Sequence, residues 1–256
     1  MSKPSKPNNI AASPSAETTF IARVIPWPKD GEPGYCNLHW TVPDKAGMRG
    51  RACSRIEDFM GMARWGAAKP GAVKDIYFCL SSQKTTGKVI NGNATALRNA
   101  HNVLALKSLW MDIDVKPEKG YATTNEAIDA LTAFVKSAHI PPPTALVLSG
   151  SGGLHAYWIS DTPLTVEEWR PYAEGLEALT KHHGLKRDPG LTTDSVRVLR
   201  VPGTFNYKST PPKGVRLAAL SQSDLSFAKS LAHIRVVSTA VTAPVTKTVG
   251  LLYDPK

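Results

Sequence analysis

The sequence contains few cysteines and no long hydrophobic run. Its three cysteines, Cys36, Cys53 and Cys79, are an odd number without paired spacing, which argues against a disulfide framework and favours a reducing, cytoplasmic location. No apolar stretch approaches the roughly 20 residues that span a membrane. Residues 1–17 lack the apolar core of a signal peptide. We therefore expect a cytoplasmic protein without a membrane partner.

Acidic residues are scarce relative to basic ones. The 256 residues include 31 lysines and arginines but 21 aspartates and glutamates, which gives a net charge of +10. Such an excess is typical of proteins that bind polyanions, although a solvated basic face would give the same total. A hydrophobic content of 42% indicates a globular protein with a real core. The length allows one large domain or two small ones.

Zinc is a weak alternative use of the cysteines. Cys36 and His39, together with Cys53 and Cys79, could supply a Cys₃His ligand set. Their spacing is irregular, however, and free cysteines are commonly buried in cores. We therefore expect no zinc site.

Hydrophobic patterns and turn residues predict alternating strands and helices from about residue 18 onward. Helices are predicted where capping residues precede apolar periodicity, at 54–65, 123–138, 165–184 and 223–233. Strands are predicted at 20–25, 35–42, 76–80, 104–115, 145–148, 155–159, 196–201 and 215–220. Residues 81–102 are predicted to form a mobile loop that could include a short helical turn. This order predicts an α+β fold in which helices cover a mostly antiparallel sheet, between a disordered arm (1–17) and a linker-like tail (237–256).

The strand predicted at 104–115 carries two carboxylates. Asp112 and Asp114 are two residues apart, so they share one strand face with Trp110, while Leu109 and its alternate neighbours point into the core. Two carboxylates on one face repel each other and must be hydrated or bind a cation. Hard oxygen ligands suit Mg²⁺ or Mn²⁺, although this short pattern also arises by chance.

A glycine-rich turn follows the strand at 145–148. The segment Ser149–Gly153 has almost no side chains, so its backbone N–H groups could approach phosphate oxygens. His155 lies at the mouth of this turn and could donate a hydrogen bond to a phosphate. A hairpin with a surface histidine is the alternative for this segment alone.

Charged residues recur further along the chain. Arg197 and Arg200 interrupt an apolar run and need anionic partners, either a phosphate or a carboxylate such as Asp188 or Asp194. Their odd spacing places them on opposite faces of a regular strand. Lys208 lies just beyond the run.

In order, these segments resemble the archaeo-eukaryotic primase superfamily, in its phage and plasmid primase-polymerase branch. The resemblance covers about residues 104–208 and rests on Trp110–Asp114, Ser149–His155, Asp188 and Arg197–Lys208. It implies an RRM-like catalytic sheet (about 104–236) joined to an N-terminal α/β unit (about 18–103), within one catalytic domain at 18–236.

The resemblance also implies a template-dependent nucleotidyltransferase of DNA replication, which makes and extends primers on single-stranded DNA from nucleoside triphosphates. Asp112, Asp114 and Asp188 would hold two Mg²⁺ or Mn²⁺ ions. The incoming nucleotide would contact Ser149, Ser151, His155, Arg197, Arg200 and Lys208. We also expect a helicase to act with this domain, in the same chain or separately.

The chain departs from the family pattern at two positions. Gly153 occupies the small-residue position two before His155, which puts the roles of the serines in doubt. Arg187 stands where the family has a hydrophobic residue, so Asp194 remains a rival to Asp188. Two other functions stay open: a non-catalytic module that binds single strands, and a two-metal nuclease.

Overall fold

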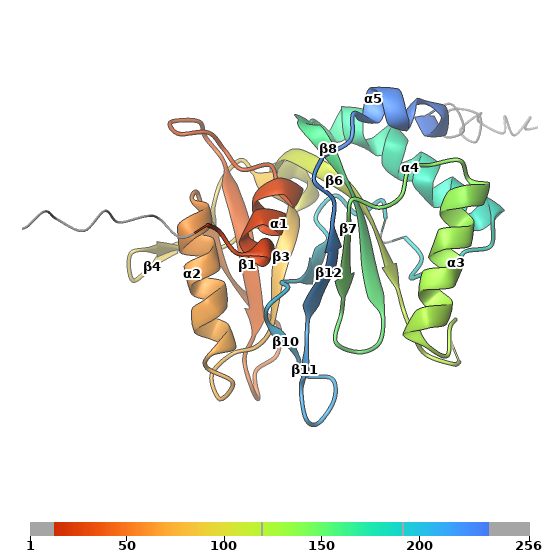
Figure 1. The fold of residues 1–256 in the computed structure, drawn as a ribbon. Helices are drawn as coiled ribbons and strands as arrows, with labels where there is room; N and C mark the ends of the chain where they lie inside the picture. The colour runs from red at the N-terminus through yellow and green to blue at the C-terminus, as the bar shows by residue number, and fades with distance from the viewer. Residues whose placement is uncertain (1–12, 119, 191, 236–256) are drawn as a thin grey trace, which may run out of the picture.

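The fold is seen in a computed structural model that describes residues 13–118, 120–190 and 192–235 (Figure 1). The helices are α1 (Ala16–Val24), α2 (Ile56–Ala67), α3 (Thr124–Ser137), α4 (Val166–His182) and α5 (Phe227–Ser230), with a 3₁₀ turn, η1 (Ala100–Asn102). Within the described ranges, none of them is both long and apolar enough to cross a membrane. The predictions for residues 1–12 and for the tail lie outside the described residues.

The centre of the molecule is an eight-stranded sheet with the order β12-β7-β8-β6-β3-β1-β2, in which β9 pairs with β3. Its strands are β1 (Tyr35–Thr41), β2 (Met48–Cys53), β3 (Lys74–Gln83), β6 (Val103–Ile113), β7 (Ala145–Leu148), β8 (Leu154–Leu164), β9 (Val198–Arg200) and β12 (Arg216–Leu220). All its pairings are antiparallel, which confirms the predicted α+β class. Because β3 pairs with β6, the two predicted units share one sheet.

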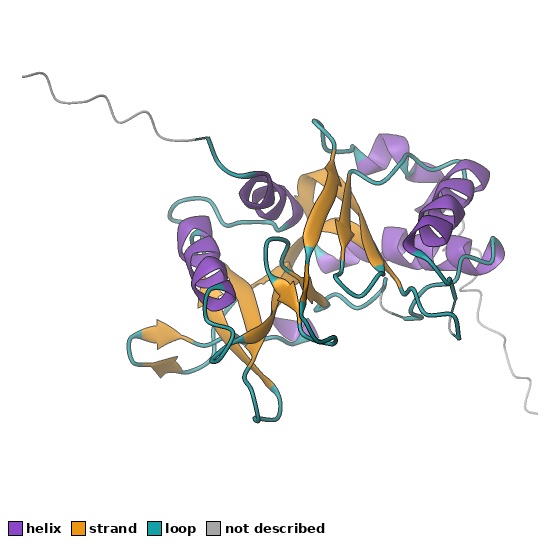
Figure 2. Ribbon diagram, turned by 60° about the horizontal axis from the view of Figure 1, so that its bottom comes forward, coloured by secondary structure: helices purple, strands orange, loops and turns teal. Residues whose placement is uncertain are grey.

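Helices pack against different parts of this sheet. Figures 1 and 2 show α2 beside the β1–β3 part, whereas α3 and α4 lie beside the β6–β8 part. Trp110 of β6 stacks on Trp169 of α4 with ring centroids 5.3 Å apart. Trp110, Leu109 and Met111 are all fully buried. Both faces of the central part of β6 are therefore covered, whereas its acidic end and the segment around Leu104 approach solvent.

The prediction of a strand at 20–25 is wrong, because most of these residues belong to helix α1. Ser15 caps α1 by accepting a hydrogen bond from the backbone of Thr18, and Phe20, Ile21 and Val24 are buried. The spacing of these buried residues is helical, and the apolar run was too short to distinguish the two structures. Because α1 begins at Ala16, order also starts inside the predicted arm.

Two of the three predicted helix caps are confirmed. Thr165 and Glu168 form both bonds of a capping box, and Thr123 accepts a bond from the backbone N–H of Glu126. The box predicted at Ser54 is wrong, because α2 begins at Ile56 after Arg55, which makes no side-chain cap.

The segment predicted as a loop at 81–102 contains regular structure. It holds the end of β3, a hairpin formed by β4 (Val89–Ile90) and β5 (Asn93–Ala94), and η1. A second small hairpin pairs β10 (Phe205–Asn206) with β11 (Lys213–Gly214). Neither β2 nor these hairpins were predicted.

Candidate active site at the end of strand β6

The pairing of β6 with β8 places Asp112 directly opposite His155. His155 Nε2 lies 3.7 Å from Asp112 Oδ1, and Arg197 Nη2 lies 3.6 Å from Oδ2. Both distances exceed those of normal hydrogen bonds, so the contacts are electrostatic. Three residues predicted from distant segments thus meet at one carboxylate.

Burial keeps His155 neutral at neutral pH. Its side chain is almost fully buried, and the loss of hydration lowers the pKa of the imidazole despite the nearby carboxylate of Asp112. Tyr157 lies with its hydroxyl 3.4 Å from His155 Nδ1, and burial raises the pKa of this phenol well above 10. The phenol can therefore donate to Nδ1, which leaves the imidazole proton on Nε2, facing Asp112.

Asp188 joins the end of β6 through its backbone. Its N–H donates to the carbonyl oxygen of Asp112 at 3.0 Å. Asp114 and Asp188 also line one cavity of about 180 Å³, together with Lys186, Arg187 and Pro189. All three predicted acids therefore come from neighbouring backbone positions. We call Asp112, Asp114, Asp188 and His155 the acid centre.

Arg187 occupies the position where a hydrophobic residue was expected. Its side chain is only 4% exposed and forms an ion pair with Glu177 of α4. Its Nε donates to Thr180 Oγ1 at 2.9 Å, and its Nη1 donates to the carbonyl oxygen of Asp188 at 2.9 Å. The guanidinium thus fixes the Asp188 backbone to α4, a task that a hydrophobic residue would perform by packing alone.

The rival acid, Asp194, makes local contacts. Its Oδ1 accepts a bond from the backbone of Val196, and its carbonyl accepts one from the backbone of Arg197. Neither contact involves Asp112 or Asp114. The geometry therefore favours Asp188 as the third acid, and its role stays a prediction.

The two predicted arginines have different partners. Arg200 pairs with Asp75 at 3.0 Å, donates to the Tyr77 hydroxyl at 3.1 Å and lies over the Tyr77 ring. Arg197 instead reaches Asp112, and its Nε is buried without a hydrogen-bond partner among the described residues. Arg197 is therefore the better candidate to meet an anionic ligand.

These pairings correct the alternative in which the arginines bind Asp188 or Asp194. Asp75 was missed, although it precedes a predicted buried strand and also accepts a bond from the backbone of Tyr207. Sheet order explains the choice of partner, because β9 pairs with β3, which carries Asp75.

The glycine-rich turn fits closely against its own chain. A side chain at Gly153 would place its Cβ 2.8 Å from the carbonyl oxygen of Ile113. Ser149 Oγ donates to the Gly153 carbonyl oxygen and lies 3.1 Å from Ser151 Oγ. Close approach to β6 therefore explains Gly153, without any need for a phosphate.

The predicted cation Lys208 follows a residue that supports this turn. Asn206 Nδ2 donates to the Ser149 carbonyl oxygen at 2.7 Å, and Asn206 Oδ1 accepts from the backbone of Lys208 at 3.0 Å. Lys208 itself is exposed. It stays a candidate for a long-range contact with an anion.

The donor chemistry of the acid centre fits a hard divalent cation, since it offers three carboxylates. Among the residues that the structure describes, however, no three His, Cys, Asp or Glu side chains are grouped to hold a metal ion. Arg197 lies against Asp112, and Lys116 Nζ lies 3.9 Å from Asp114 Oδ2. Metal binding at this centre would require these carboxylates to turn from their cationic neighbours.

No model of a known protein family matches the chain, and no curated protein sequence matches it. Solved structures of primases resemble it, among them the following two. The AEP domain of the cyanophage S-2L primase-polymerase (PrimPol) gives a TM-score of 0.54 at 11% identity, over 77% of this chain and 88% of that chain. The primase RepB′ gives 0.51 at 12% identity, over 81% of this chain and 58% of that chain. The chain therefore has the primase-polymerase (AEP) fold.

Proposed function

Because the chain has the AEP fold, we propose that it is a template-dependent nucleotidyltransferase, a DNA primase-polymerase that makes and extends primers on single-stranded DNA. The observation that carries the proposal is the meeting of Asp112, His155 and Arg197, with the Asp188 backbone bonded to Asp112. Carboxylates can hold catalytic divalent ions, while an imidazole N–H and a guanidinium can stabilise negative charge on a triphosphate.

Asp112, Asp114 and Asp188 are the residues that would hold Mg²⁺ or Mn²⁺. Bound divalent ions supply charge neutralisation at a triphosphate and a lowered pKa for an attacking hydroxyl. The acids come from one strand end and one adjoining backbone segment, so their Cα positions are fixed by the sheet. Fixed backbone positions favour catalysis because only the carboxylate side chains need to turn when the ions bind.

His155 and Arg197 would bind the triphosphate of the incoming nucleotide. The neutral imidazole offers its Nε2–H as a donor without adding charge to a buried site. Arg197 offers a buried Nε–H that has no partner among the described residues. Arg200 and Lys208 would support them through longer-range charge, and the hydroxyls of Ser149 and Ser151 through hydrogen bonds.

One observation favours the non-catalytic alternative. Arg197 and Lys116 lie against two of the acids, and no metal-binding group of three is formed among the described residues. In a domain that has lost catalytic activity, these ion pairs would persist and keep the carboxylates from binding metal ions. That alternative predicts binding of single-stranded DNA without nucleotide incorporation.

The test is synthesis on a single-stranded DNA template with labelled nucleotides and either Mg²⁺ or Mn²⁺. We expect the unmodified chain to make and extend primers, and the Asp112→Asn/Asp114→Asn variant to lose this activity. Asp129→Asn, an exposed acid on α3, is the matched control and should retain full activity.

Activity of the double variant equal to that of the control would contradict the proposal. Absence of synthesis by the unmodified chain, with intact binding of single-stranded DNA, would favour the non-catalytic module. Shortening of a labelled DNA strand without added nucleotides would favour the nuclease.

A further inference from the structure

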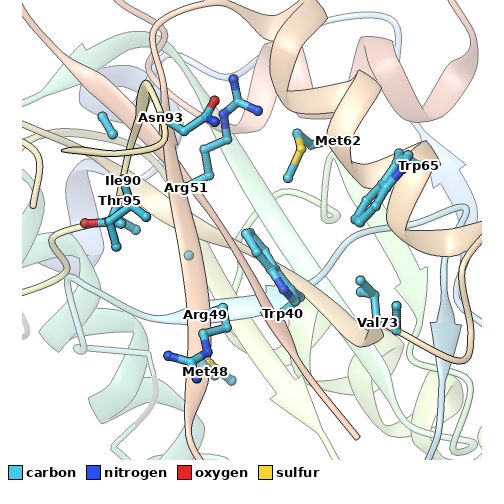
Figure 3. A pocket seen from close by; sticks show the side chains of 14 residues that line it. Trp40, Met48, Arg49, Arg51, Met62, Trp65, Val73, Ile90, Asn93 and Thr95 are labelled. Atoms are coloured by element: carbon cyan, nitrogen blue, oxygen red, sulfur yellow. The ribbon is translucent and has the colours of Figure 1, made fainter. Parts of the chain in front are cut away.

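A second cavity, of about 690 Å³, lies at the β2 end of the sheet. Its walls are α2, the β1–β2 pair and the β4–β5 hairpin, and its size is typical of sites for small organic groups. Figure 3 shows Trp65 and Met62 on one side of it and Asn93, Ile90 and Thr95 on the other. We call it the tryptophan pocket, after Trp40 and Trp65.

Large apolar side chains in the tryptophan pocket remain open to solvent. Trp65 is 49% exposed and Ile90 is 57% exposed, while Trp40 and Met62 are half-buried. Apolar side chains exposed together in a hollow, such as Trp65 and Ile90, are typical of sites that bind a ligand or partner. An aromatic ring exposed in this way offers a flat face on which a nucleobase can stack.

The charged residues of the pocket are arginines only. Arg49 and Arg51 are two residues apart on the edge strand β2, so their side chains share one face, and the pocket lining contains no aspartate or glutamate. Neither guanidinium forms an ion pair with a carboxylate of the described residues. The pocket therefore combines aromatic surface with uncompensated positive charge, which suits an aromatic anion.

The hairpin wall is firmly attached to the body of the protein. Its turn uses Asn91 and Gly92, both with positive φ, the geometry of a tight two-residue hairpin. Thr95 bridges to Arg51 of β2, and the backbone N–H of Ala96 donates to the carbonyl oxygen of Gly50 at 3.1 Å. The two arginines are thus held between β1 and the hairpin.

Asn102 links the two chain segments that lead into and out of the β4–β5 hairpin. Its Nδ2 donates to the carbonyl oxygens of Thr85 and Leu97, both at 2.9 Å, and its Oδ1 accepts from the Thr85 hydroxyl. Residues far apart along the segment are therefore tied at one point. The pocket is consequently preformed.

We propose that the tryptophan pocket binds single-stranded DNA, with a nucleobase stacked on Trp65 or Trp40 and a backbone phosphate on Arg49 and Arg51. This inference rests on the proposed function, for which it supplies a surface that holds the template. In the sheet order, β2 is separated from β6 by β1 and β3, and β9 also pairs with β3 on the side of the acid centre, so the pocket lies three to four strand spacings, roughly 14–19 Å, from the acid centre. A strand of a few nucleotides can cover that distance.

The test measures binding of a fluorescently labelled oligo(dT) by the full chain and its variants. We expect Trp65→Ala to weaken binding by about tenfold, because the stacking of one base is lost. Trp65→Phe should restore most of it. Arg170→Ala removes an exposed arginine of α4, away from the pocket. It is the control for the loss of positive charge at Arg49 or Arg51, and it should have little effect on binding.

Salt dependence separates the arginines from the tryptophan. Arg49→Ala/Arg51→Ala should reduce the slope of log affinity against log salt by about 0.7, since the contact with one phosphate is lost. Trp65→Ala should leave the slope unchanged, and Arg49→Lys/Arg51→Lys should preserve it. Circular dichroism of each variant checks that the fold is kept, and the conservative variants test the proposal if an alanine variant unfolds.

Unchanged oligo(dT) affinity in both Trp65→Ala and the double alanine variant would overturn the inference. The inference would also be overturned if these variants lost binding of a free nucleoside triphosphate but kept their affinity for oligo(dT). The pocket would then hold a single nucleotide. The Asp112→Asn/Asp114→Asn variant should still bind oligo(dT). Failure of synthesis with normal pocket-dependent binding would therefore count against the proposed function alone.

Discussion

The acid centre and the tryptophan pocket lie on one sheet but are built in opposite ways. In the acid centre, buried or half-buried side chains meet at the interior strands β6 and β8, and Arg197 offsets the charge of Asp112. The tryptophan pocket consists of exposed aromatic rings and unpaired arginines at the edge strand β2. Chemistry requires fixed geometry, whereas docking of a flexible strand requires accessible surface, so this difference is what the two proposed roles demand.

Buried charge should make the acid centre sensitive to single substitutions. Arg187→Leu leaves Glu177, which is 12% exposed, without its buried partner, and should destabilise the fold by about 3–5 kcal/mol. The double variant Glu177→Leu/Arg187→Leu removes both charges and should recover most of this loss. Urea unfolding measures both effects.

Lys181→Ala is the control for this pair. Lys181 also contacts Glu177, but its side chain is 72% exposed, so its removal should change stability by less than about 0.5 kcal/mol. A loss below about 1 kcal/mol in Arg187→Leu would show that the stability of the fold does not depend on the buried Arg187–Glu177 pair.

The choice between the two candidate acids gives the next largest effect. Asp188→Asn should reduce primer extension by about 10²–10³-fold, the usual cost of removing a group that stabilises developing charge. Asp194→Asn should retain most activity, because the contacts of Asp194 are confined to its own turn. The reverse ranking in a primer-extension assay would assign the third acid to Asp194.

Local patterns predicted most of the sheet around the acid centre. Strand β7 was recognised because it follows Pro143 and ends at the glycine-rich turn, β8 because it follows that turn, and β6 because of its apolar run. The partners of Arg197 and Arg200 could not be predicted, because they depend on which strands become neighbours. The positions of Asp112 and His155 were predicted, whereas the ion pair with Arg197 was not.

The tryptophan pocket was missed for the same physical reason. Its walls come from three separate segments, and no short pattern relates them. One signal was present: Asn91-Gly92 between short apolar segments is typical of a two-residue hairpin, and it lay inside the predicted loop. Short hairpins at the edge of a sheet are predicted from their turn residues more readily than from hydrophobic periodicity.

The acid centre contains the buried His155, and the buried His39 lies beside the tryptophan pocket. The stability of the protein should therefore depend on pH. His39, next to Gly50 of the tryptophan pocket, is 6% exposed, and burial followed by the charge of Arg98 lowers its pKa to about 4. Above pH 6.5 both folded and unfolded chains carry a neutral imidazole. As pH falls from 6.5 to about 4, the unfolded chain takes up the proton first, so stability decreases, by roughly 2 kcal/mol at pH 5.

His39→Leu should remove this part of the pH dependence. Unfolding by urea at pH 7.5 and pH 5 should show a smaller loss for the variant, with the remainder due in part to His155, whose pKa is also lowered. His101→Asn, an exposed histidine, should lose as much as the unmodified chain. Equal losses in all three proteins would mean that His39 is hydrated in solution.

Two glycines, Gly153 beside the acid centre and Gly61 on α2, should give the smallest effects. Gly153→Ala would bring a Cβ within 2.8 Å of a β6 carbonyl, and should cost about 1–3 kcal/mol because backbone cannot move aside easily. Gly61 is exposed on α2, where an added Cβ meets nothing within 4 Å. Gly61→Ala should instead stabilise the protein by about 0.8–1 kcal/mol through helix propensity. Thermal unfolding measures both, and effects of the same sign would contradict the difference in crowding between these two glycines.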